Sequence, residues 1–150
     1  MNGKRNLHEL PCQVEQLVPQ KPPMLLINKL LRRDRGIEEF AVTEATVPRK
    51  GVFVDPHQGI FPEYFIELVA QSIAAVNGYD VLVEGGKTKK GFLVGVDEFK
   101  WHDDVESGDV LRVEMEKDFE FGPVTVMRGR VIDNQGKLLA AGAIKVWEEK

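Results

Sequence analysis

The sequence has a single cysteine, no basic excess and no long apolar run, and each shortage excludes a class of protein. Cys12 alone cannot form an internal disulfide, which is compatible with a reducing compartment. The formal net charge is -4 and the pI about 5.5, whereas a protein that binds mainly nucleic acid needs a net basic face. No segment approaches the ~18 apolar residues of a membrane span, and the first residues lack the apolar core of a secretory signal. We therefore expect a cytoplasmic protein with no membrane span and no nucleic-acid partner.

Two polar segments have the composition of ligand sites but not their spacing. His102 lies beside Asp103 and Asp104, but adjacent residues on an extended segment point in alternating directions and cannot all face one metal ion. Residues 84–91, rich in glycine and lysine, have neither the spacing of a phosphate-binding P-loop nor a strand before and a helix after them. The sequence therefore predicts a solvated turn, a loop and no metal site.

Alternating apolar and polar residues predict an antiparallel sheet. Phe40 and Val42 share one face of an expected strand, while Ala41, Thr43 and Ala45 share the other. We expect five to six strands, drawn from residues 37–47, 92–96, 110–116, 124–132 and 138–147 and from the apolar run 24–31, which is either a strand or a short buried segment. Gly-Pro and Asp-Asn-Gln-Gly turns make the last three strands consecutive and antiparallel. A short helix is expected at residues 12–18, after a loosely ordered tail over residues 1–11.

One long helix is expected in the middle of the chain. It begins near Pro62, whose missing N–H is not needed in a first turn, and ends at the stop signal Asn77-Gly78. Apolar residues cover most of its circumference, so the helix should be buried on nearly all sides. A curved sheet wrapped round this helix would bury the apolar surfaces of both. With 150 residues and 43% hydrophobic content, the chain is predicted to be a single α+β domain over residues 1–150.

Three polar side chains interrupt the apolar surface of this helix. Glu63, Glu67 and Gln71 recur every four residues and therefore share one face. Either this face meets water, or it lines a cavity in which partial desolvation would make Glu67 a useful acid. The spacing does not choose between the two interpretations.

Three blocks of sequence resemble a known family. The blocks LVPQKPPMLLINKLL, PEYFIELVAQSIAAVNG and GFLVGVDEFKWHDDVESGDVLRVEME are similar to those of hotdog-fold 3-hydroxyacyl-(acyl-carrier-protein) dehydratases, and the likeness runs from about Cys12 to Val146. The pattern from Glu67 to Gly78 is nearest to the aryl-polyene-type branch. The resemblance implies a hotdog fold and a homodimer, or a higher oligomer of dimers, that joins its sheets edge to edge. It also implies active sites at the dimer interface and an acyl thioester on an acyl carrier protein or coenzyme A as substrate.

The resemblance further implies a mechanism that needs no cofactor. A loop histidine removes the proton next to the thioester carbonyl, a carboxylate on the central helix helps the 3-hydroxyl to leave as water, and N–H groups at the helix start hold the carbonyl oxygen. Glu67 matches the family carboxylate. The family histidine lies earlier than His57, where this chain has Val52 and Phe53, and the glycine that is frequent just inside the helix start is missing.

Three functions therefore compete. The first is a dehydratase of fatty acid or polyene lipid biosynthesis, with His57 as base and Glu67 as acid. The second is a hotdog acyl thioesterase in which Glu67 activates water or attacks the thioester, a chemistry that needs no histidine. The third is a non-catalytic acyl-binding partner subunit. In each case we expect the acyl group to lie beside the helix, in contact with Phe61, Pro62, Tyr64, Gln71 and Phe92.

Overall fold

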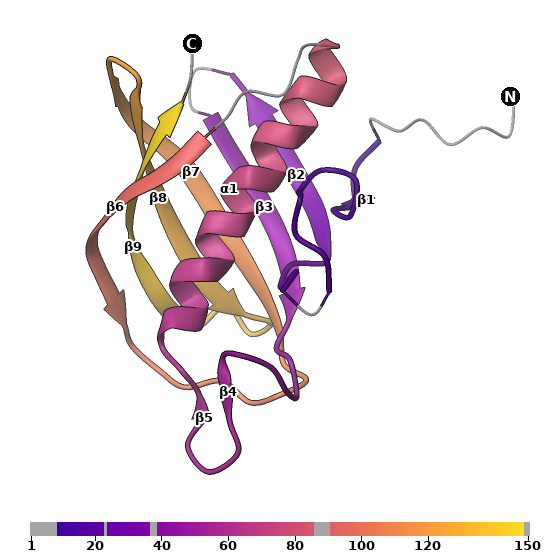
Figure 1. Ribbon diagram of the computed structural model, residues 1–150, viewed down its shortest axis with the longest axis vertical. Helices are drawn as coiled ribbons and strands as arrows, with labels where there is room; N and C mark the ends of the chain where they lie inside the picture. Colours follow the sequence, from indigo (N-terminus) through magenta and orange to yellow (C-terminus); the bar gives the residue numbers. More distant parts are fainter. Residues whose placement is uncertain (1–8, 23, 37–38, 86–90, 149–150) are drawn as a thin grey trace, which may run out of the picture.

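The computed structural model describes residues 9–22, 24–36, 39–85 and 91–148. Its main sheet consists of β1 (Cys12–Gln13), β2 (Lys29–Arg35), β3 (Glu39–Thr46), β6 (Gly91–Trp101), β7 (Val110–Phe121), β8 (Val124–Asp133) and β9 (Leu138–Glu148). The strands lie in the order β1-β2-β3-β7-β8-β9-β6, and every neighbouring pair is antiparallel. One helix, α1 (Glu63–Glu84), crosses the concave face of this sheet, and a separate hairpin of β4 (Val54–Asp55) and β5 (Gly59–Ile60) projects beyond the start of α1 (Figure 1).

The predicted α+β architecture is confirmed, but the sheet has seven strands where five to six were expected. Residues 12–18 do not form the expected helix: Cys12 and Gln13 pair with β2, and the N–H of Leu17 then donates to the carbonyl oxygen of Val14 at 2.8 Å in a turn. A strand of two residues has no period that a sequence can display, which explains the error. Residues 1–8 of the expected tail and residues 86–90 of the expected loop lie outside the described part of the chain.

The alternation predicted for the strands matches their burial. On β7, Leu111, Val113 and Met115 are buried toward the helix. On β3, Ala41, Thr43 and Ala45 of one predicted face are buried, and Val42 of the other face is buried as well, at 9% exposed. The segments 110–116, 124–132 and 138–147 are consecutive antiparallel strands joined by tight turns, as expected. The alternation of side chains between the two faces of a strand therefore determines which residues form the inner face of the sheet.

The helix runs past its predicted end. Asn77-Gly78 was read as a stop signal, but α1 continues to Glu84 and is capped by Gly85, which has a φ of 69° in the left-handed region. Gly78 serves another purpose, because a Cβ placed there would lie 2.1 Å from the carbonyl oxygen of Leu17. Glycine at this position lets the segment after β1 cross the helix at backbone contact.

Apolar packing and two hydroxyl groups fix α1 on the sheet. Its buried apolar side chains are Tyr64, Phe65, Leu68, Val69, Ile73, Ala75 and Val76. Where Val69 faces Gly129 of β8, a Cβ on the glycine would lie only 2.6 Å from the Cγ1 of the valine, so the helix approaches the sheet closely. The hydroxyl of Ser72 donates to the carbonyl oxygen of Leu68 at 2.6 Å, so Thr43 must donate to Ser72 across a 2.7 Å gap.

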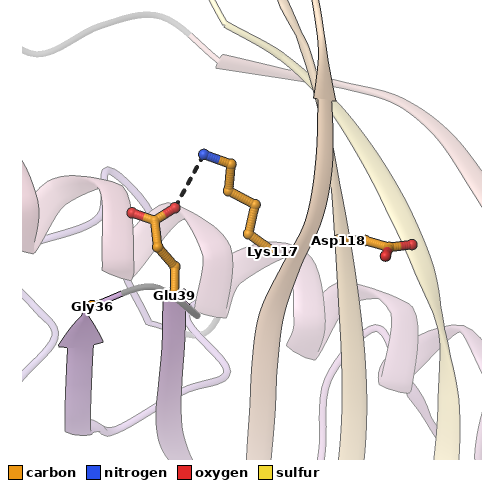
Figure 2. Close-up of a pocket in the computed structure, with 4 residues that line it drawn as sticks. All are labelled: Gly36, Glu39, Lys117 and Asp118. Atoms are coloured by element: carbon orange, nitrogen blue, oxygen red, sulfur yellow. Dashed lines mark ion pairs between the residues drawn. The ribbon is translucent and has the colours of Figure 1, made fainter.

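The far end of α1 is tied to β2 by ion pairs. Arg33, whose side chain is 6% exposed, donates from Nε and Nη2 to the two carboxylate oxygens of Asp80 at 3.0 and 2.7 Å. Arg33 also contacts Glu39, which pairs in turn with Lys117. Figure 2 shows Glu39 and Lys117 pointing toward each other across a shallow hollow, with Asp118 directed away. The carboxylates of Glu39 and Asp80 neutralise the side chains of Arg33 and Lys117. We therefore interpret the residues around this hollow as a structural ion-pair network.

One edge of the sheet is exposed, and one side of the helix is only partly covered by the rest of the chain. On the edge strand β6, Leu93, Val94 and Val96 are 49%, 55% and 42% exposed. The helix contains an 18-residue window whose mean hydropathy is 1.2. In the structure, 39% of this window is buried. By length and composition alone α1 meets the test for a membrane span, but a core helix meets the same test, so this is weak evidence for a span.

Candidate active site

Glu67 lies in the second turn of α1, half-buried, with its carboxylate held by the next turn of the helix. The side-chain amide of Gln71 donates from Nε2 to Oε1 of Glu67 at 3.1 Å. Gln71 is only 1% exposed and is itself fixed from outside the helix. Its Nε2 also donates to the carbonyl oxygen of Met24 at 2.8 Å, and its Oε1 accepts from the N–H of Leu26 at 2.8 Å. The position of the Glu67 carboxylate therefore depends on a segment more than forty residues away in the chain.

The polar face of α1 changes character along its length. Glu63 is exposed, Glu67 is half-buried and Gln71 is buried. Neither simple interpretation of the spacing describes this gradient, since the face meets water at one end and protein at the other. Glu67 lies at the transition, where a carboxylate can be held firmly and still be reached.

The start of α1 is built by the residues just before it. Pro62 is the N-cap residue, with φ -57° and ψ -27°, and it supplies no side-chain cap. The N–H of Tyr64 donates to the carbonyl oxygen of Phe61 at 3.0 Å, and that of Phe65 donates to the carbonyl oxygen of Pro62 at 3.1 Å. Phe61 is 37% exposed, and its own N–H donates to the carbonyl oxygen of Phe53 at 2.9 Å. The helix start is thereby joined to the loop before the hairpin.

His57 lies in the turn of the β4–β5 hairpin and is exposed. Asp55 shapes this turn, because its Oδ1 accepts the N–H of His57 at 2.7 Å and that of Gln58 at 3.0 Å. Both His57 and Glu67 are described, and within the protomer no hydrogen bond or ion pair joins their side chains. The hairpin projects beyond the start of α1, as Figure 1 shows.

An aromatic ring stands where the resemblance placed a histidine. Phe53 is half-buried and packs against Tyr64, with ring centroids 6.1 Å apart. Tyr64 also meets Phe65 at 5.8 Å in an edge-on arrangement. Tyr64 is fully buried, and this burial raises the pKa of its hydroxyl well above the ordinary value. The ring of Phe53 was missed as a site residue by sequence reasoning, because its contact with the helix depends on the path of the intervening hairpin.

The remaining predicted residues lie apart from this group. Phe92 is on β6 and pairs in backbone register with Trp147, while its side chain lies outside what the structure describes. His102 is exposed in the predicted turn after β6. Asp103 forms an ion pair with Lys137, and the hydrogen bond from that ammonium lowers the pKa of the Asp103 carboxyl. In the described part of the chain, no group of three or more His, Cys, Asp or Glu side chains has the arrangement of a metal site.

Comparisons with known proteins agree with the resemblance. A family model described as ApeP-like, ApeP dehydratase, matches residues 12–150. The 3-hydroxyacyl-[acyl-carrier-protein] dehydratase FabZ of Halalkalibacterium halodurans is 31% identical over 131 residues, which cover 85% of this chain and 89% of the relative. The FabZ dehydratase of Oceanobacillus iheyensis is 31% identical over 121 residues, which cover 78% of this chain and 83% of the relative.

Solved structures share the fold. The dehydratase heterocomplex ApeI:P from Xenorhabdus doucetiae superposes with a TM-score of 0.77 at 21% identity, covering 93% of this chain and 92% of the other. The E. coli PaaI protein from the phenylacetic acid degradation operon superposes with a TM-score of 0.61 at 16% identity. The match covers 81% of this chain and 78% of PaaI. The predicted hotdog fold and the predicted family are both confirmed. The chain belongs to the ApeP-like dehydratase family, in the wider group of hotdog-fold 3-hydroxyacyl-[acyl-carrier-protein] dehydratases.

Proposed function

We propose that this protein removes water from a 3-hydroxyacyl thioester. In this reaction a base takes the proton from the carbon next to the thioester carbonyl, and that electron pair forms the new carbon–carbon double bond. The bond from carbon 3 to its hydroxyl oxygen breaks, and an acid supplies the proton that turns the leaving hydroxyl into water. Atoms and electrons balance without an oxidant or reductant, so a base, an acid and an oxyanion site are sufficient.

The observation that carries this proposal is the clamped carboxylate of Glu67 near the start of the central helix. Gln71 holds Oε1 of Glu67, and in the described residues Oε2 accepts no hydrogen bond from the protein. That second oxygen is therefore free to deliver a proton to the leaving 3-hydroxyl. A general acid must stay within hydrogen-bond reach of the leaving group, which an amide anchored to the backbone of a neighbouring segment ensures.

We assign the base to His57, on the hairpin that leads into α1. Its ring is exposed, which leaves the imidazole free to meet a substrate entering from solvent. The hairpin is paired only with itself, as a sheet separate from the main one. Histidine is suited to the task because its ordinary pKa range spans neutral pH.

The exposed edge of β6 supports the homodimer that the family resemblance implies. An unpaired edge strand exposes backbone N–H and C=O groups that a second copy can bond, and apolar side chains such as Leu93 and Val96 favour burial there. Joining two copies along β6 would extend the sheet and cover the exposed side of α1. Equilibrium sedimentation of the parent and of a Val96→Lys variant tests this: the variant is expected to shift toward monomer.

A carrier protein is the proposed source of the thioester. The loop before the hairpin exposes Arg49 and Lys50, close in sequence to Phe53 and to the start of the site. Adjacent cations attract an acidic partner over several ångströms, and such attraction weakens as salt rises. Replacing Arg49 and Lys50 together by glutamate should raise KM for a carrier-bound substrate while leaving KM for a small thioester unchanged.

A second candidate function is that of a partner subunit. Among the described residues no hydrogen bond or ion pair joins the side chains of His57 and Glu67, and the superposed dehydratase structure is a heterocomplex. In that case this chain would supply Glu67, and a related chain would supply the histidine. The hotdog thioesterase hypothesis gains no support from the structural neighbours, since likeness at their identity shows the fold alone.

Turnover of a 3-hydroxyoctanoyl thioester by the purified protein tests the proposal. Loss of a general acid or base should lower kcat by about a hundredfold or more, in both Glu67→Gln and His57→Ala. The matched controls are Glu116→Gln, an exposed carboxylate on β7, and His102→Ala, an exposed histidine, and neither should change kcat. An active parent that is indifferent to His57→Ala would refute the assignment of the base. An inactive parent that gains activity with a second dehydratase chain would favour the partner-subunit function.

A further inference from the structure

The hydroxyl of Tyr64 is a buried donor that the fold leaves without a partner. The residue is 0% exposed, and among the described residues no group hydrogen-bonds to its Oη. Buried polar groups are almost always paired, because an unpaired one loses its hydrogen bonds to water and gains none in return. A phenylalanine would fill the same space without this penalty. An unpaired hydroxyl in this position therefore points to a partner that arrives from outside the protein.

The position of Tyr64 indicates where that partner binds. The residue lies in the first turn of α1, one turn before Glu67, and side chains three residues apart on a helix are neighbours. Helical side chains lean toward the helix N-terminus, so the phenol ring projects from the first turn toward the start of α1. Its hydroxyl is accordingly nearer to the helix start than the carboxylate is. A substrate whose leaving hydroxyl lies at Glu67 would place its carbonyl on that side.

We propose that the Tyr64 hydroxyl donates a hydrogen bond to the carbonyl oxygen of the bound acyl thioester. This inference rests on the proposed function, and it adds a side-chain donor to the backbone N–H groups of the helix start. When the neighbouring carbon loses its proton, negative charge develops on the carbonyl oxygen. A donor already in place, in a dry environment, stabilises that charge strongly because nothing has to reorganise.

The surroundings of Tyr64 favour a donor over a base. Burial raises the pKa of the hydroxyl above its ordinary value, so it keeps its proton at neutral pH. The rings of Phe53 and Phe65 enclose it without offering an acceptor. Of these two, Phe53 comes from a loop that follows Gly51, which has a φ of 129°, and is next to the 69% exposed Val52. For the acyl group to reach the hydroxyl, the half-buried Phe53 ring that packs against Tyr64 has to move.

Tyr64→Phe tests the inference, because it removes the hydroxyl and keeps the ring. The control is Tyr79→Phe, which removes the other tyrosine hydroxyl of the chain from the same helix. With a 3-hydroxyoctanoyl thioester as substrate, Tyr64→Phe should lower kcat by about a hundredfold, with KM changed much less, as for other oxyanion donors. Thermal unfolding of both variants shows whether any loss comes from misfolding. Tyr64→Phe should unfold at the same temperature as the parent or at a higher one.

Binding of the saturated octanoyl thioester separates this inference from the proposed function. The compound has the carbonyl but no 3-hydroxyl, so it binds without losing water. Loss of one hydrogen bond should weaken its binding to Tyr64→Phe by about fivefold, whether or not the parent is an active dehydratase. If the parent is inactive but Tyr64→Phe still binds the octanoyl thioester more weakly than the parent does, the dehydratase function is refuted and the hydrogen bond from Tyr64 is supported. A folded Tyr64→Phe that matches the parent in kcat and in thioester affinity would overturn the inference.

Discussion

Replacing Gln71 by methionine would test the clamp that holds Glu67. Methionine has nearly the same length and volume, but it cannot make the three hydrogen bonds of the amide, whose lengths are 2.8, 2.8 and 3.1 Å. The N–H of Leu26 would be left unpaired in a buried position, at a cost of about 2 kcal/mol, because it has no access to water. The carbonyl oxygen of Met24 belongs to an exposed residue and can regain water, so its loss costs about 1 kcal/mol.

These losses add to about 3 kcal/mol in the free energy of unfolding, which is a large share of the stability of a typical domain. Urea unfolding followed by circular dichroism at a fixed protein concentration measures it. With a slope of about 2 kcal/mol per molar urea, the midpoint should fall by about 1.5 M. Gln16→Met, at an exposed position, is the matched control and should stay within about 0.5 kcal/mol of the parent. A Gln71→Met midpoint equal to that of the control would refute the clamp.

Three further changes have defined outcomes. Gly78→Ala, which normally favours a helix, should destabilise the protein by about 2 kcal/mol because its Cβ overlaps the Leu17 carbonyl; a raised melting temperature would contradict this. Asp80→Asn should cost about 3 kcal/mol in urea unfolding, since it leaves the buried Arg33 guanidinium without its bidentate partner; a loss below 1 kcal/mol would show that Glu39 suffices. Burial raises the pKa of Tyr64 in the folded protein, so its ionisation leaves the free energy of unfolding unchanged below pH ~10 and lowers it by up to about 1.4 kcal/mol per pH unit above that. Tyr64→Phe should therefore lose less stability than the parent between pH 9 and 11, and equal losses would count against this.

The parts of the fold that a sequence can predict are those governed by local period. The alternation on β7 identified the inner face residue by residue, because side chains on a strand switch faces at every step. On β3 it identified Ala41, Thr43 and Ala45, but Val42 of the other face is buried as well. The position of the central helix was predictable because apolar side chains cover most of its circumference, but the expected burial on nearly all sides is wrong, since Leu82 and Val83 are 36% and 46% exposed. The spacing of Glu67 and Gln71 was visible too, and it correctly put both on one face.

What the sequence could not predict depends on contacts between distant segments. Gly78 looks like a stop signal until Leu17 is found against it, and only then is its role one of close approach. The hydrogen bonds of Gln71 depend on Met24 and Leu26, which lie between β1 and β2, more than forty residues earlier in the chain. The exposed position of His57 follows from a hairpin of two-residue strands, which are too short to carry a pattern. A candidate site can thus be located from sequence, but not the partners that hold it.

The strand order has a consequence for how the chain folds. β6 is made before β7, β8 and β9, yet its only pairing in the described sheet is with β9, the last of them. Until Leu138–Glu148 has been synthesised, the apolar β6 has no neighbour on either side and competes for any other unpaired edge. Long-range pairing of this kind is slow, because a large loop must close before any contact rewards it. Chains that stop short of β9 should therefore aggregate through β6 and should not yield a smaller folded domain.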